Sequence, residues 1–182
     1  MFAPADTSSP PHRLSLPAWF ARVGLPFDAE EQAGIIALKC GLDIAAGAAI
    51  AGAASWWDAA QFIRADAWDS RWWDAEEEER ERLWGVAAER LTEEALLGRL
   101  TSCTGELAGT VRIAATFAAS RAGVGDPELI RAAIDAALLA AHQQALAELA
   151  MVDSGHYFRR KFELFAAGRW PLGVCAGRYV VF

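Results

Sequence analysis

Apolar residues recur every three or four positions along most of the chain, which is the period of an α-helix with one buried face. The clearest case begins at Asp126, a typical cap residue, with Pro127 in the first helical position. We predict a helix from Pro127 to about Met151. Its apolar stripe consists of Ile130, Ile134, Leu138 and Ala141.

Similar signals predict helices in the first third of the chain. Asp28 followed by Glu31 has the spacing of a capping box, which predicts a helix over 29–40. Asp43 is expected to cap a further helix over 44–54. Ala and Gly dominate that stretch, so another helix could approach it closely.

The tetrapeptide WWDA occurs twice, at 56–59 and 72–75. In each copy an aromatic residue precedes the Asp, and Gln or Glu follows three positions later, which is the pattern of a helix start. We therefore predict that Asp58 and Asp74 cap two helices. Core filling, a partner surface and a small-ligand site all remain open for the local Trp cluster. This cluster comprises Trp56, Trp57, Trp68, Trp72 and Trp73.

The run EEEERERLW follows the second copy. It predicts ion pairs of Glu76 with Arg80 and of Glu78 with Arg82, one helical turn apart. Acidic residues in a first turn also complement the helix dipole. We interpret the run as a solvated helix face, with a site for a divalent cation or a basic partner as the alternative.

Further helical periodicity fills the second half of the chain. A helix is expected to start at Thr92, to be interrupted over 101–105, and to resume at about Leu107. The last helix should begin after Asp153 or Ser154.

The C-terminal residues have a different character. Two β-prone runs, 172–174 and 179–182, are separated by Cys175-Ala176-Gly177, which predicts a small hairpin. A two-stranded hairpin is marginal alone, so it must pack on the helices. The expected anchors are Trp170, Tyr179 and Phe182.

Together these elements predict an all-α fold: a compact multi-helix bundle of about seven or eight helices with a small C-terminal β-hairpin packed on it. The length of 182 residues suits one domain. We expect a mobile leader over 1–14, where Pro and Ser are frequent. A single helical domain is expected over 15–182, including the terminal hairpin at 169–182.

Charge and composition narrow the classes of function. The net charge is −7, although residues 154–182 carry five basic residues against one acidic residue. This balance argues against a nucleic-acid partner, which requires a broad basic footprint. The longest apolar run, 44–57, is shorter than the roughly 20 residues of a membrane-spanning helix. We expect a cytoplasmic protein with no membrane partner, and the Ala, Arg and Trp bias suggests a bacterial source.

Candidate catalytic and metal-binding residues are few. The three cysteines are far apart and fit reduced thiols. Cys103 lies near Glu106, and a negative neighbour disfavours a reactive thiolate. Asp153 and His156 form a single DxxH pair, whereas helical di-iron sites require two His-bearing motifs. We expect no metal and no cofactor, and the absence of a recognisable catalytic set favours a non-enzymatic function.

The sequence therefore favours a non-catalytic protein-binding domain, such as an adaptor or a toxin-neutralising immunity-type protein. An acidic surface would speed docking to a protein partner with basic character. The expected partner-binding surface combines acidic and Trp residues: Trp56, Trp68, Trp72, Glu76, Glu77, Glu78 and Glu79.

Two alternatives remain. One is a small-molecule sensor or enzyme, with a pocket between helices near Gly47, Gly52 and the Trp cluster. The other is a scaffold that oligomerises through an apolar helix face. The sequence does not fix the oligomeric state.

Overall fold

The computed structural model describes residues 17–42 and 47–182, and the expected leader (1–14) and the expected cap Asp43 lie outside the described residues. The described part contains six helices and one three-stranded sheet. They follow in the order α1 (Ala29–Lys39), β1 (Ala49–Gly52), α2 (Trp56–Ile63), α3 (Ser70–Ala88), α4 (Glu93–Arg121), α5 (Pro127–Leu149), α6 (Tyr157–Ala166), β2 (Pro171–Cys175) and β3 (Arg178–Val181).

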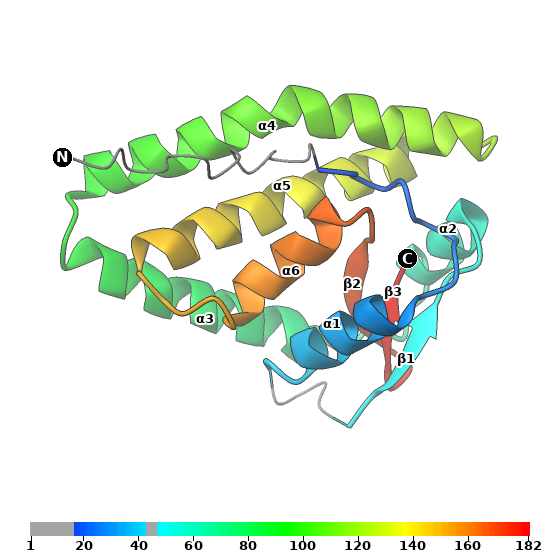
Figure 1. Cartoon of the computed structure of the whole chain (residues 1–182), viewed down its shortest axis with the longest axis horizontal. Helices are drawn as coiled ribbons and strands as arrows, with labels where there is room; N and C mark the ends of the chain where they lie inside the picture. The colour runs from blue at the N-terminus through cyan, green and yellow to red at the C-terminus, as the bar shows by residue number, and fades with distance from the viewer. Residues whose placement is uncertain (1–16, 43–46) are drawn as a thin grey trace, which may run out of the picture.

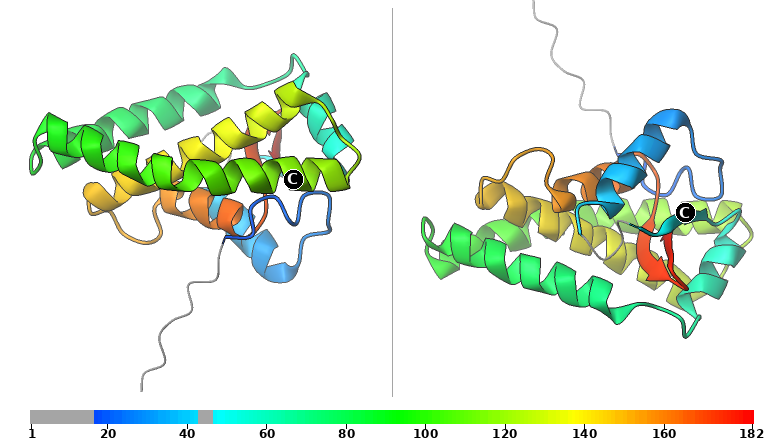
Figure 2. Two further views of the ribbon diagram at one scale, coloured as in Figure 1. Left: turned by 90° about the horizontal axis from the view of Figure 1, so that it is seen from above. Right: turned by 90° about the horizontal axis from the view of Figure 1, so that it is seen from below.

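Helix α5 is the central element of the fold. It packs against α3, α4 and α6, so that other helices surround it on several sides (Figures 1 and 2). Its buried positions are mainly Ala, which lets three neighbours approach a single helix closely. The predicted start at Asp126 and Pro127 is confirmed, because Asp126 Oδ1 accepts the N–H of Glu128 at 3.0 Å.

The predicted C-terminal hairpin is confirmed and belongs to a larger sheet. Strands β2 and β3 pair antiparallel around Ala176-Gly177, where both residues have positive φ, as a tight two-residue hairpin turn requires. The strand order is β1-β3-β2, with β1 parallel to β3. Figure 1 shows this sheet at one end of the helical body, beside α1 and α2.

The prediction of a helix over 44–54 is wrong for the part of that range that the structure describes. Residues Ala49–Gly52 form β1, which pairs with Arg178–Val181 of β3. The short-range composition is rich in Ala and favours a helix. Backbone pairing with β3, more than 120 residues later in the chain, overrides that local preference.

Helix α4 is continuous, so the expected interruption over 101–105 is also wrong. It starts at Thr92 as predicted, with Thr92 Oγ1 accepting the N–H of Ala95. Thr104 Oγ1 donates back to the carbonyl of Leu100 at 3.1 Å, which keeps its hydroxyl satisfied within the helix. This continuity helps to explain why the described part holds six helices rather than seven or eight.

The helix caps are partly as predicted. Asp28 and Glu31 form the expected capping box of α1. Neither WWDA Asp is a cap: Ser55 caps α2 and Asp69 caps α3, so each helix starts before the tetrapeptide ends. Asp58 instead lies at the third helical position, where its carboxylate accepts the N–H of Ala54 at 3.0 Å.

The cap of the last helix also differs from the expectation. Helix α6 is capped by His156 rather than by Asp153 or Ser154, and His156 Nδ1 accepts the N–H of Phe158 at 3.2 Å. Asp153 serves the preceding turn, where its carboxylate accepts the N–H of Gly155 at 2.7 Å. Within 17–42 and 47–182, no helix combines the length and the apolar character needed to cross a bilayer.

Candidate functional site

The two WWDA copies share an inside–outside arrangement of their Trp pairs. In each, the first Trp is buried and the second is exposed, because adjacent helical residues point about 100° apart. Trp56 and Trp72 therefore fill the core and do not form part of an exposed partner surface, which corrects that element of the expectation. Trp57 and Trp73 reach solvent, and Trp73 is 47% exposed.

Trp72 anchors α3 to the C-terminal sheet. Its ring centroid lies 5.4 Å from that of Tyr157 and 5.0 Å from that of Tyr179. Gly173 allows this packing, because a Cβ there would lie 3.0 Å from Trp72 Cδ1 and the backbone has φ +130°. The sheet and α6 thereby fix the start of α3, which carries the four glutamates of the predicted surface, residues 76–79.

Glu76 lies at the centre of a buried polar network, in contrast to the solvated position that we expected for it. Its side chain is almost fully buried. Lys161 Nζ donates to both of its carboxylate oxygens at 2.7 Å, and Gln143 Nε2 donates to Oε2 at 3.1 Å. The hydroxyl of Tyr157 donates to Oε1. Three side chains, one from α5 and two from α6, thus donate to the single carboxylate that α3 contributes.

The electrostatics of this network favour a charged Glu76. Burial alone would raise the pKa of Glu76, but the charge of Lys161 and the three donors outweigh it and lower that pKa. The same burial and the Glu76 charge raise the pKa of the Tyr157 hydroxyl well above its usual value. Glu76 and Lys161 are therefore an ion pair with the surrounding donors satisfied, which is the arrangement that makes a buried pair tolerable.

A small pocket opens above this ion pair, and we call it the Trp68 pocket. Its volume is about 240 Å³. Trp68 and Trp73 form an aromatic corner, with ring centroids 5.8 Å apart, and Trp68 Nε1 is held by the carbonyl of Phe62 at 2.9 Å. The remaining lining residues are mainly apolar: Ile63, Glu76, Ala136, Leu139, Lys161, Pro171 and Leu172.

The acidic run forms ion pairs one residue away from the predicted positions. Arg80 pairs with Glu77, and Arg82 pairs with Glu79, both three residues apart rather than four. The predicted pair of Glu76 with Arg80 is wrong because Glu76 turns inward to Lys161. The predicted pair of Glu78 with Arg82 is wrong because Arg82 pairs with Glu79.

Exposed carboxylates nevertheless line one face of α3 beside Trp73. Their spacing of three or four residues places them along one side of the helix. We call this set the acidic face: Asp74, Glu77, Glu78 and Glu81. Asp74 and Glu78 make no ion pair or side-chain hydrogen bond with any other described residue.

The structure also places the residues of the alternative expectations. The ring of Phe27 packs on Gly52 and leaves no room for a side chain there, because a Cβ would lie 3.0 Å from Phe27 Cε2. Gly47 is exposed. Burial, together with Glu148 and Glu106, raises the pKa of the Cys103 thiol, which disfavours the thiolate. Among the described residues, no three His, Cys, Asp or Glu side chains gather closely enough to hold a metal ion.

The sequence interpretation missed Lys161, Gln143 and Tyr157. One signal was available: Tyr157 and Lys161 are one turn apart in the last helix, on a stripe that also carries Phe158 and Phe165. A Lys whose side chain is buried within an aromatic stripe is almost always paired. Comparison of the chain with protein-family models, curated proteins and solved structures found no match.

Proposed function

We propose that this chain is a protein-binding domain that holds one apolar side chain of its partner in the Trp68 pocket. The observation that carries the proposal is the aromatic corner of Trp68 and Trp73, open to solvent above a satisfied ion pair. Trp at a partly exposed apolar site is the residue type most enriched at interface hot spots.

The size of the Trp68 pocket favours a protein anchor over a free small molecule. Pockets for small ligands have volumes of about 300–1,000 Å³, whereas this one measures about 240 Å³. Because Glu76 and Lys161 satisfy one another at its floor, neither offers a free charge to a ligand. Recognition inside the pocket therefore depends on shape and apolar contact, which suits a Trp, Phe or Leu side chain.

The acidic face favours a partner with basic residues beside its anchor side chain. Asp74 and Glu78 form no ion pair with another described residue, and they lie one and five residues after Trp73 on α3. A partner segment with Lys or Arg on either side of its anchor would place those charges against them. Such complementarity raises the association rate and makes binding sensitive to salt.

Adaptors and toxin-neutralising immunity-type proteins are the two roles within this class that we propose. They differ in affinity: immunity pairs of known type reach dissociation constants of about 10⁻¹³–10⁻¹⁶ M, whereas adaptors bind reversibly. A micromolar dissociation constant for the natural partner would favour an adaptor.

The test uses two synthetic peptides with identical Lys-Arg flanks, one with a central Trp and one with a central Ser. Calorimetry and the indole N–H signals of Trp68 and Trp73 in NMR spectra report binding. We expect the Trp peptide to bind and the Ser peptide not to bind. The Trp peptide should bind to Trp73→Ala at least about tenfold more weakly than to the wild type. Its affinity for the wild type should fall in high salt. Trp57→Ala is the matched control, because Trp57 is also exposed but does not line the pocket.

Charge reversal tests the acidic face separately. Glu78→Lys should weaken binding and reduce its salt dependence, whereas Glu94→Lys, an exposed reversal at the start of α4, should not. Equal binding of the two peptides, or unchanged affinity of Trp73→Ala, would contradict the proposal. In cells that make the chain naturally, a photo-crosslinker at position 73 but not at position 57 should capture the partner.

A further inference from the structure

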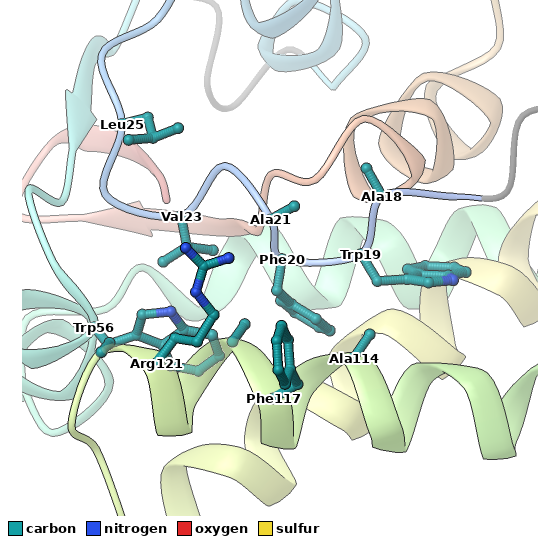
Figure 3. A pocket seen from close by; sticks show the side chains of 12 residues that line it. Ala18, Trp19, Phe20, Ala21, Val23, Leu25, Trp56, Ala114, Phe117 and Arg121 are labelled. Carbon is teal, nitrogen blue, oxygen red and sulfur yellow. The ribbon is translucent and has the colours of Figure 1, made fainter.

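A second concave site lies away from the Trp68 pocket, between residues 18–25 and the last turns of α4 (Figure 3). We call it the Phe117 groove. Its volume of about 460 Å³ falls within the range of about 300–1,000 Å³ that small-molecule sites occupy. Figure 3 shows Phe20 and Phe117 facing one another across it, with Trp56 toward one end and Trp19 toward the other.

The wall of the groove opposite α4 is fixed by buried hydrogen bonds. Arg169, which is fully buried, donates through Nη1 to the carbonyls of Arg22 at 2.6 Å and Leu25 at 2.7 Å. The N–H of Ala18 donates to the carbonyl of Ala166 at 2.7 Å. Because α6 and Arg169, two residues before β2, hold this segment, the groove is formed before any ligand arrives.

The floor of the groove leaves aromatic surface in water. Phe117 is 63% exposed, although it faces the buried ring of Phe20. Ala114 and Ala118, one turn before and one residue after Phe117, contribute small side chains that keep the groove open. Covering apolar surface of this kind with a ligand is favourable, because it removes that surface from water.

Arg121 supplies the one charged side chain among the residues that line the groove. Its guanidinium lies 5.8 Å from the centroid of the Phe117 ring, and it forms no ion pair with a carboxylate of the described residues. In Figure 3 the side chain reaches from α4 toward Val23, across the mouth of the groove. A basic residue in the last turn complements the dipole of α4, but that role does not require apolar walls around it.

We propose that the Phe117 groove binds a small organic carboxylate with an aromatic or branched aliphatic body. The body would cover the exposed ring of Phe117. The carboxylate would pair with the guanidinium of Arg121, which matches a carboxylate with two parallel donors. The site is independent of the proposed protein-binding function, since the two share no lining residue.

Phenylbutyrate is the probe for this site, with phenylbutyramide and phenylbutylamine as neutral and cationic matches of the same shape. Binding to the full chain is measured by calorimetry and by shifts of backbone amide signals in NMR spectra. We expect phenylbutyrate to bind with shifts confined to 18–25 and the end of α4. The amide should bind about tenfold more weakly, and the amine should not bind.

Variants with matched controls decide the roles of the two α4 side chains. Arg121→Gln should reduce the affinity for phenylbutyrate to that of the amide, and Phe117→Ser should abolish binding of both. Arg112→Gln and Ile113→Ser change exposed residues of the same helix outside the groove and should leave the affinity unchanged. All four positions are exposed, so the substitutions should leave the thermal unfolding midpoint almost unchanged. Measurement of that midpoint for each variant checks that the chain is still folded.

Three results would overturn the proposal. The first is absence of phenylbutyrate binding at low-millimolar concentration, and the second is equal affinity of the wild-type and Arg121→Gln chains. The third is concentration-dependent self-association that Phe117→Ser removes, because a second copy of the chain would then occupy the groove.

Discussion

Lys161 Nζ lies 2.7 Å from both carboxylate oxygens of Glu76, and the two residues are 85 positions apart in the chain. This contact joins α6 to α3, and Gln143 joins the same carboxylate to α5. The three helices therefore meet at a polar point inside an otherwise apolar interface. Its disruption has consequences for stability that depend on which member is changed.

Loss of Lys161 alone should be severely destabilising. Lys161→Met leaves the Glu76 charge buried with only neutral donors, and removal of one partner of a buried pair costs about 3–5 kcal/mol. Glu76→Leu should lower the free energy of unfolding by a similar amount, because it leaves the ammonium buried. The double variant Glu76→Leu/Lys161→Met should recover most of the loss, since an apolar pair of similar volume removes both charges.

Urea unfolding of the four chains measures this cycle, with Glu78→Gln as an exposed control on the same helix. The control should change stability by no more than about 0.5 kcal/mol. If the double variant were as unstable as the single variants added together, the two side chains would not be coupled.

Local sequence signals predicted the helix ends that local contacts determine. Asp28, Thr92 and Asp126 cap helices as predicted because each side chain accepts an N–H two or three residues later. The helix predicted around Ala49–Gly52 is a strand instead, because the structure of this segment depends on pairing with β3. The break expected over 101–105 is absent from α4. A helix that is packed along its length tolerates a few polar and Gly residues with low helix propensity.

The candidate site could be predicted only in part for the same reason. The sequence indicated that the Trp cluster and the acidic run were important, and both border the Trp68 pocket. The direction in which each side chain points depends on where α3 begins. Asp69 rather than Asp74 caps α3, and contacts with Tyr157 and Lys161 turn Trp72 and Glu76 inward. Those partners are not encoded near the WWDA motif.

The ion pair of Glu31 with Arg169 should give the protein a pH-dependent stability in acid. Hydrogen bonds from Arg169, with further donors from Asp28 and Arg22, lower the pKa of Glu31 from 4.5 to about 2. Because the folded pKa is depressed, the stabilisation is fully present above pH 4.5 and is lost as the pH falls toward 2. At about 1.4 kcal/mol per pKa unit, this contribution is about 3 kcal/mol.

The measurement compares urea unfolding of the wild type and Glu31→Gln between neutral pH and about pH 3. We expect the difference between the two chains to shrink as the pH falls below 4.5. Glu30→Gln changes the exposed neighbour and serves as the control. A difference between the wild type and Glu31→Gln that stayed constant with pH would show that Glu31 is not stabilised as a carboxylate.

The turn of the C-terminal hairpin can be improved by substitution. Ala176 has φ +48°, a left-handed conformation that costs an L-residue with a Cβ about 1–2 kcal/mol. Ala176→Asn should therefore raise the free energy of unfolding by about 0.5–1 kcal/mol, because Asn tolerates this conformation. Gly177→Ala should lower it, although no atom lies near the added Cβ. Thermal unfolding of both variants checks the signs, and a lower midpoint for Ala176→Asn would refute the assignment of the turn.

The ring of His156 should exist as a single tautomer. Its Nδ1 accepts the N–H of Phe158, so the proton must lie on Nε2, which is 2.7 Å from Glu79 Oε1. NMR spectra of the ring nitrogens at neutral pH should show this tautomer. His156→Ala removes the cap of α6 and should cost about 1 kcal/mol, whereas His156→Asn keeps a cap acceptor and should cost less. A proton found on Nδ1, or equal stability of the Ala and Asn variants, would mean that the ring does not cap the helix.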